Sequence, residues 1–373
     1  MGPFLETLLG GLLTGMLYSL VALGFVLIFK ASGVFNFAQG AMVLFAALTL
    51  ARLTDKIDGK ELHLAHFVVA AGLLGVACVL VGWWAWREYV ARGAGPGERR
   101  KLLLLAAAGA LIGGGVALAY GKGDWPLWLA IAATASIMSL LAYAIERLVL
   151  RHLVNQEGII LFMATLGIAY FLEGFGQTVW GSDVYKIDLG LPKEPIFLFE
   201  SVFDGGLLVD GGELVSAVIA ISMVIVLAIF FQKTRIGRAL RAVADDHAAA
   251  QSVGIPLNSI WLIVWTVSGF VALVAGMIWG AKLGVQFSIS LIALKALPVL
   301  ILGGFTSVPG AIVGGLIIGA GEKLSEVFLA PILVKAFDLA GGGIENWFAY
   351  MLALVFLLFR PQGLFGERLI ERV

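Results

Sequence analysis

The sequence has little charge and no excess of either sign. Only 13% of its 373 residues are charged and 60% are hydrophobic, while the 25 basic residues balance the 25 acidic ones. This composition excludes a soluble globular protein, because that class needs a charged surface. The balance of charge gives no indication of nucleic-acid binding. Together with a mean hydropathy of +0.99, the composition predicts a polytopic membrane protein.

The residues of metal and catalytic sites are also scarce. Cys78 is the one cysteine, which excludes an intrachain disulfide and a cysteine-rich metal site. The four histidines are scattered over predicted loops and share no ligand spacing beyond the weak pair His63 and His66, so no metal site is expected. No Ser-His-Asp arrangement, zinc-hydrolase motif or GxxxxGK[ST] phosphate loop occurs. The sequence therefore predicts no enzyme and no cofactor in this chain; if transport is ATP-driven, the ATPase, with its ATP and Mg, is a separate polypeptide.

Apolar runs of about the length of a membrane span fill most of the chain. The longer runs cover residues 5–29, 65–86, 102–119, 126–146, 159–180, 213–231, 260–280 and 310–328. Shorter runs cover residues 41–53, 291–303 and 345–359. The start MGPFLETLL has neither a basic region nor a cleavage site, and it predicts a retained first span. We expect an all-α transmembrane bundle of about 10–11 spans that forms a single domain, residues 1–373.

Positive charge gathers in loops that lie on one side of an eleven-span arrangement. These residues are Arg87, Arg92, Arg99, Arg100, Lys101, Arg147, Arg151, Lys233, Arg235, Arg238, Arg241, Arg360, Arg368 and Arg372. The positive-inside rule places them in the cytoplasm, with the N-terminus outside and the C-terminus cytoplasmic. The acidic segment 182–213 then falls on the external, periplasmic side. It is either a loop that faces a partner or an ordinary solvated loop.

Two polar stretches interrupt the apolar pattern beside runs that are short for a span. They read GVFNFAQG at 33–40 and GGFTSVPG at 303–310. Unwound backbone at membrane depth is tolerated only where protein or a water-filled cavity satisfies its polar groups. Transporters place substrate sites at such breaks, because freed amides, carbonyls and half-helix dipoles hold a polar solute. The pattern therefore predicts two broken or re-entrant helices beside a substrate path.

Six side chains are candidates for that path, and each has a structural alternative. They are Asn36, Gln39, Thr306, Ser307, Glu173 and Lys295. The first four flank the breaks, where they either bond a polar solute or cap the helices that follow. The last two are ionisable groups in apolar runs, where a charge is costly enough to indicate function. Their alternative is snorkelling or bonding between helices. The pairs Gly310/Gly314 and Gly315/Gly319 predict close helix packing.

Residues 232–258 form a polar interruption between two long apolar runs. Asp245 or Asp246 can N-cap a short helix there, Gly254 suits the left-handed position past its end, and Pro256 prevents its continuation. We therefore expect a rigid two-turn cytoplasmic helix over 245–254, suited to mechanical contact with a soluble partner.

The string GRALRAVADDHAAAQSVGI within this interruption closely resembles the coupling loop of branched-chain amino acid permeases, a subfamily of ATP-binding-cassette importer permeases. The general signature of such permeases is Glu-Ala-Ala, three residues, then Gly; Ala248 stands in place of the Glu here. Similar motifs are SGVFNFAQG, ERLVLRHL at 146–153, the block LKALPVLILGGFTSVPGAIVGGLIIGAGE and RPQGLFG at 360–366. The resemblance covers most of the chain, and residues 84–125 look like an inserted helical hairpin.

The resemblance implies a permease subunit in a bacterial inner membrane that moves its substrate by alternating access. Its implied partners are a second related permease, two cytoplasmic ATPase subunits, a periplasmic substrate-binding protein and membrane lipid. The residues implied in ATPase coupling are Arg241, Asp245, Asp246, Ala249, Ala250, Gly254 and Ile255. Branched-chain amino acids are the expected substrate, and urea, amides or other small carboxylates are the alternatives. An ion-coupled secondary transporter would explain the broken helices, but not the coupling string.

Overall fold

The computed structural model describes residues 2–33, 35–54, 126–153, 156–192, 194–198, 206–245, 247–337 and 343–366. Statements about the structure below concern these residues. The predicted spans 65–86 and 102–119, the predicted hairpin 84–125 and Asp246 lie outside them. So do Cys78 and the pair His63 and His66.

Within the described ranges, the long apolar helices lie where the apolar runs predict them. Helices long and apolar enough to cross a membrane are α1 (Gly2–Ser32), α5 (Leu127–Leu148), α6 (Gly158–Trp180), α7 (Gly211–Lys233) and α10 (Leu257–Leu283). Shorter apolar helices are α2 (Gln39–Thr54) and α14 (Ile344–Phe359). The elements α11 (Ile292–Gly303) and α12 (Val308–Leu324) belong to one span-like pair that bends by 113°. The polytopic helical class predicted from the sequence is therefore confirmed.

Helix α1 is the centre of the bundle. Its most apolar stretch is 83% buried inside the protein, whereas those of α5, α6 and α7 are 28–33% buried and leave apolar side chains on the outer surface. Helices α7, α10, α11 and α12 all pack on α1. Gly15 of α1 meets Gly315 and Gly319 of α12 so closely that a Cβ on either glycine of α12 would overlap α1. The predicted close packing at Gly315 and Gly319 is present, because glycine removes the side chain that would hold the helices apart.

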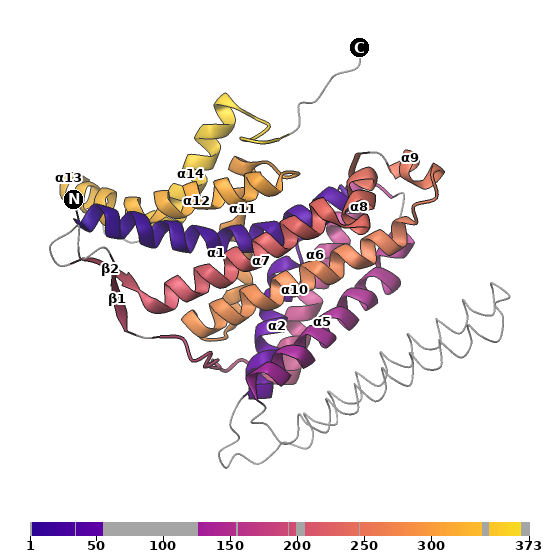
Figure 1. Ribbon diagram of the computed structural model, residues 1–373, viewed down its shortest axis with the longest axis horizontal. Helices are drawn as coiled ribbons and strands as arrows, with labels where there is room; N and C mark the ends of the chain where they lie inside the picture. Colours follow the sequence, from indigo (N-terminus) through magenta and orange to yellow (C-terminus); the bar gives the residue numbers. More distant parts are fainter. Residues whose placement is uncertain are drawn as a thin grey trace.

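The elements outside the long helices lie at opposite ends of the bundle (Figure 1). A hairpin of two antiparallel strands, β1 (Pro195–Leu198) and β2 (Leu207–Asp210), adjoins the N-terminal end of α1. There the backbone N–H of Leu208 donates to Glu6 at 3.0 Å. At the other end, α8 (Arg235–Asp245) and α9 (His247–Ser252) connect α7 to α10. The predicted external segment 182–213 and the predicted coupling loop 232–258 are therefore far apart.

The coupling loop differs from the sequence prediction at its start. Residues 235–245, expected only as a polar stretch, form the helix α8, whose N-cap is Thr234: its hydroxyl accepts from the N–H of Gly237 at 3.0 Å. Asp245 is the last residue of α8 and does not N-cap the next helix, which begins at His247. The expected helix over 245–254 is therefore shorter. The other predicted cap, Asp246, directly precedes α9 and lies outside the described residues, so the N-cap of α9 stays a prediction.

The end of α9 follows the prediction. Gly254 has a φ of +85° in the left-handed region, which glycine adopts without strain. The N–H of Ile255 donates to Ala250 O at 3.0 Å, and the N–H of Gly254 donates to Gln251 O at 3.0 Å. This pair of bonds is the Schellman motif, and it gives α9 a fixed C-terminal boundary. Ile255 also packs on the apolar core, so the loop is held to the bundle at this point.

Candidate functional site

The first break in the helices lies between Ser32 of α1 and Gln39 of α2, and buried side-chain amides satisfy it. Asn36 and Gln39 are both fully buried. Asn36 Oδ1 accepts from the N–H of Ala38 at 3.0 Å, and Gln39 Oε1 accepts from the hydroxyl of Ser268 on α10 at 2.6 Å. The unwound backbone is thus paired by protein groups, as a break at membrane depth requires.

Helix α6 fastens the same break from its other side. The N–H of Phe37 donates to Thr165 Oγ1 at 3.2 Å, and the Thr165 hydroxyl lies 3.3 Å from Phe35 O. Phe35 stacks on Phe25 of α1 with ring centroids 4.7 Å apart, and Phe37 meets Phe162 of α6 edge-on at 5.9 Å. The break therefore positions two aromatic rings between α1 and α6.

The second break lies between Gly303 of α11 and Val308 of α12, and backbone groups satisfy most of it. The hydroxyl of Ser307 N-caps α12 by accepting from the N–H of Gly310 at 3.0 Å. Gly303 and Gly310 are in backbone contact, so the two helices meet at the break itself, where neither position has room for a Cβ. Thr306 is partly buried in the turn.

The C-terminal motif RPQGLFG forms backbone hydrogen bonds with the second break. The N–H groups of Leu364 and Phe365 donate to Leu302 O at 2.8 Å and Gly303 O at 3.1 Å, respectively. These carbonyls lie in the last turn of α11, where a helix leaves its carbonyls unpaired. Gly363 has a φ of +79°, and a Cβ there would lie 2.8 Å from the backbone nitrogen of Gly304. A segment more than fifty residues away in sequence thus completes the break.

The two breaks meet through aromatic rings. Phe305 of the second break lies edge-on to Phe35 of the first, with centroids 6.4 Å apart, and Phe29 of α1 is 5.5 Å from Phe305. The approach of the breaks thus runs through phenylalanine side chains. The polar residues Asn36, Gln39, Thr306 and Ser307 take no part in these ring contacts.

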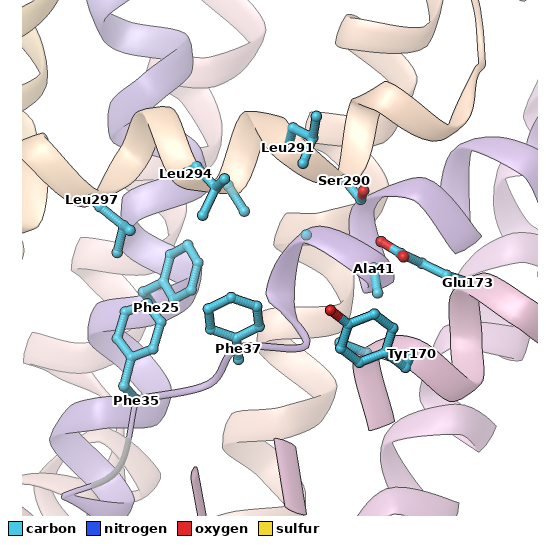
Figure 2. A pocket seen from close by; sticks show the side chains of 13 residues that line it. Phe25, Phe35, Phe37, Ala41, Tyr170, Glu173, Ser290, Leu291, Leu294 and Leu297 are labelled. Atoms are coloured by element: carbon cyan, nitrogen blue, oxygen red, sulfur yellow. The ribbon is translucent and has the colours of Figure 1, made fainter. Parts of the chain in front are cut away.

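A cavity of about 240 Å³ opens beside the first break. It is lined by Phe25, Phe35, Phe37, Gly40, Ala41, Ala169, Tyr170, Glu173, Ser290, Leu291, Ala293, Leu294 and Leu297. Figure 2 shows Phe25, Phe35, Phe37, Leu294 and Leu297 toward one side, and Glu173, Tyr170 and Ser290 toward the other, with Leu291 beside Ser290. The cavity is thus amphipathic, and its volume is just below the roughly 300–1,000 Å³ typical of sites for drug-sized ligands.

The structure separates the six predicted path residues. Glu173 lines the cavity, with its side chain directed into it (Figure 2). Asn36, Gln39, Thr306 and Ser307 are not among the lining residues: Asn36, Gln39 and Ser307 hold the breaks together, and Thr306 lies in the turn. Their place in a substrate path stays a prediction.

Lys295 belongs to a polar network between α1, α11 and α12. Its ammonium lies 2.8 Å from Glu322, whose carboxylate also accepts from the Tyr18 hydroxyl at 3.0 Å. The Lys295 ammonium is also 5.9 Å from the ring centre of Tyr18, over its face. Because the side chain of Glu322 is only 8% exposed, the ion pair and the hydroxyl neutralise a charge that would otherwise be costly in the bundle.

Sequence reasoning missed Glu322, Tyr18 and the aromatic wall of the cavity. Glu322 was detectable, because it is an ionisable residue within the apolar run 310–328, the same criterion that selected Glu173. Phe25, Phe35 and Phe37 gave no comparable indication, since aromatic residues are abundant throughout this sequence.

A second cavity, of about 720 Å³, lies at the end of the bundle that carries the β-hairpin. Its walls come from residues 184–192 and from the ends of α7 and α10, and they include Lys186, Asp188 and Asp210. Lys282 and Glu213 form an ion pair of 2.8 Å in the same wall. Described parts of the predicted external segment 182–213 thus line a polar, charged hollow.

The helices α8 and α9 carry the predicted coupling residues. The Arg241 guanidinium donates to Phe231 O near the end of α7, which ties α8 to that helix. Ala249 and Gly254 are exposed, whereas Ala250 is buried. The residues at this end therefore divide into those that attach the loop and those that a partner can reach.

Among the described residues, no group of three or more His, Cys, Asp or Glu side chains could hold a metal ion.

Comparison with known proteins gives consistent matches. A family model described as "Branched-chain amino acid transport system / permease component" matches residues 7–94 and 100–360. The chain is 25% identical over 373 residues to the high-affinity branched-chain amino acid transport system permease protein BraD of Pseudomonas aeruginosa, covering 99% of this chain and 98% of the relative. It is also 25% identical to the permease protein LivH of the corresponding system of Escherichia coli K12, again covering 99% and 98%. A probable LivH of Methanocaldococcus jannaschii is 32% identical over 149 residues, covering 40% and 46%.

Proposed function

The chain belongs to the family of permease components of branched-chain amino acid transport systems, and we propose that it is the membrane-spanning subunit of an ATP-driven importer for branched-chain amino acids. The observation that carries the proposal is the family match along almost the whole chain. The protein is a multi-pass membrane protein with several apolar helices. The amphipathic cavity beside the first break supports passage of a small solute that has both a polar and an aliphatic part.

In this proposal the chain itself is not catalytic. ATP and Mg would be held by two cytoplasmic ATPase subunits, which agrees with the lack of a phosphate loop in the sequence. A second related permease and an external substrate-binding protein would complete the assembly. Closure of the ATPase pair would rock the helices between inward-open and outward-open states, which is alternating access.

The loop of α8 and α9 is the proposed contact with an ATPase. Its support is the capped, short helix α9, which is fixed at one end by the Schellman motif and presents exposed Ala249. A rigid helix transmits a displacement, whereas a flexible loop would absorb it. Arg241 supports the same role, because it ties α8 to the end of the membrane helix α7.

The orientation proposed from charge places α8 and α9 in the cytoplasm and the β-hairpin outside. In a variant with Cys78→Ser, Asp183→Cys should react with an impermeant thiol reagent added to intact cells. Ser252→Cys should react only after permeabilisation. Both positions are exposed on the chain itself, and expression without the ATPase and the binding protein leaves the side of the membrane to decide access. The reverse pattern would overturn the orientation.

The transport proposal is tested in proteoliposomes that contain the whole complex, with its binding protein added. Leucine, isoleucine and valine should be accumulated only with ATP, while urea and short amides should not. Ala249→Glu should abolish coupling: ATP hydrolysis persists and uptake falls, because the charged side chain blocks close docking. The matched control is Ala336→Glu on α13 (Ala330–Phe337), an exposed alanine far from α9, which should transport normally. Accumulation of urea or amides in place of the amino acids would contradict the proposed substrate.

A further inference from the structure

The carboxylate of Glu173 differs from those of Glu213 and Glu322, two other acidic side chains that lie in or beside the apolar bundle. Glu322 is paired with Lys295 and Tyr18, and Glu213 is paired with Lys282. The Glu173 carboxylate makes no hydrogen bond or ion pair with any residue that the structure describes. It lies in the membrane helix α6, about two turns before the C-terminal end at Trp180, in an apolar run where an unpaired charge is costly and its presence indicates a function.

The surroundings of Glu173 suit an ammonium group with an aliphatic tail. The carboxylate enters the cavity from one side, beside the hydroxyl of Tyr170 (Figure 2). The opposite side is the stacked pair Phe25 and Phe35, together with leucines of α11. A carboxylate without a fixed cation attracts a mobile one, and the aromatic and aliphatic wall removes an apolar side chain from water.

We propose that Glu173 is the specificity-determining residue of the cavity and receives the ammonium group of an aliphatic amino acid during its passage. This inference rests on the proposed function and adds to it the group of the solute that the membrane subunit recognises. The aliphatic side chain lies against Phe25 and Phe35. The Tyr170 hydroxyl is the nearby donor for the solute's carboxylate.

The proposal has a direct consequence for selectivity. Urea, amides and keto acids lack an ammonium group, so they would leave the Glu173 charge unpaired in the cavity. A site built to bond one polar group rejects analogues that lack it more strongly than it rejects small changes in an apolar tail. The membrane subunit would therefore itself select solutes that carry an ammonium group, independently of the external binding protein.

The test measures occupancy of the cavity by protection of a cysteine. Ser290→Cys lines the cavity and is close in size to the native residue. It is introduced with Cys78→Ser in the complete transporter, and labelling of this chain by a small thiol reagent is followed by mass spectrometry. Four probes share the branched aliphatic tail: leucine, 3-methylbutan-1-amine, 4-methylpentanoate and 4-methylpentanamide.

Leucine and the amine should slow labelling, whereas the acid and the amide should not. Glu173→Gln should raise the half-protecting concentration of leucine about tenfold, the effect of one lost charge-assisted bond. Glu345→Gln, the same change outside the cavity, should leave protection as it is. Equal protection by the amide, or unchanged protection in Glu173→Gln, would overturn the proposal.

Two further outcomes distinguish failure of this inference from failure of the proposed function. If the cysteine is not labelled in any nucleotide state, the cavity is closed to solutes by lipid or a partner subunit, and the inference is wrong. Uptake of labelled leucine by the parental complex is measured in parallel. Uptake without the Glu173 effect refutes only the inference, while absence of uptake of any branched-chain amino acid refutes the proposed function.

Discussion

The two helix breaks differ in the groups that form hydrogen bonds with their unwound backbone. The first is held by side chains: Asn36 within the break and Gln39, Thr165 and Ser268 from three helices supply its hydrogen-bond partners. The second is held mainly by backbone: N–H groups of residues 364 and 365 pair with the last carbonyls of α11. Both keep unwound chain inside the bundle, yet different substitutions should disrupt each of them.

The difference explains where glycine and where polar residues are needed. Backbone-to-backbone pairing requires the two segments to lie in contact, and Gly303, Gly304 and Gly363 allow that contact. Side-chain pairing instead leaves space between segments, and the aromatic rings of Phe25, Phe35 and Phe37 line that space without filling it. This is why the cavity adjoins the first break.

The largest effect is expected at the backbone-sealed break. Gly363→Val should lower the free energy of unfolding by about 3 kcal/mol, because a left-handed φ is strained for valine and about two hydrogen bonds are lost. Chemical unfolding of the purified protein in detergent measures it. Gly190→Val is the control: its φ is also positive, at +64°, but no atom lies within 4 Å of its Cβ position, so only the strain remains. Equal losses would show that residues 363–366 do not stabilise the break.

The next effect is expected at the side-chain break. Gln39→Leu should cost about 2 kcal/mol, because the Ser268 hydroxyl and the Asn36 amide lose a partner in a buried place. Gln177→Leu, an exposed glutamine on α6, is the matched control and should be close to neutral. A thermal shift in detergent compares the two variants. A Gln39→Leu protein as stable as the parent would mean that side-chain pairing is dispensable there.

A smaller effect is expected at Lys295, far from the second break along α11. Lys295→Met leaves the buried Glu322 with only the Tyr18 hydroxyl, and should cost about 1.5 kcal/mol because the lysine is partly exposed. The double variant with Glu322→Gln should recover part of this loss, since it removes the unpaired charge. A double-mutant cycle on unfolding free energies measures the coupling. Additive losses would show that the ion pair does not join α11 to α12.

The smallest effect is expected at the N-cap of α12. Ser307→Ala should cost about 1 kcal/mol, the usual value for loss of a helix cap. Ser222→Ala is the control, because its hydroxyl bonds only to its own helix and faces outward. Thermal unfolding of both proteins decides the comparison. A loss above that of Gln39→Leu would show that side-chain bonds matter more at the second break than at the first.

Local patterns accounted for much of the fold. Apolar runs located α1, α5, α6, α7 and α10, because a span must be apolar over its length whatever packs on it. Glycine and serine at the break residues 303–310 gave the N-cap at Ser307 and the close approach at Gly310. The prediction of the coupling helix was accurate at its end, where Gly254 acts locally, but it did not include α8, the separate helix that begins after Thr234.

The candidate site was less predictable. Glu173 was identified because charge is rare in an apolar run, and the structure places it in the cavity. Asn36 and Gln39 were selected for the same polarity, but their side chains bond within the first break. No pattern along the chain distinguishes a polar group that bonds a neighbour from one that faces a cavity.

The sequence by itself determined the membrane class, the long helices, the two breaks and the family resemblance, because each depends on composition or on residues close together in the chain. Only the tertiary structure decided which polar groups are paired and where space is left. Lys295 meets Glu322 and Tyr18, residues 364–365 meet the end of α11, and Phe25 meets Phe35. Apart from the Phe25–Phe35 stack, these contacts join segments distant in sequence. Whether a charged group such as the Glu173 carboxylate is accessible to a ligand depends on whether the fold places a pairing group beside it.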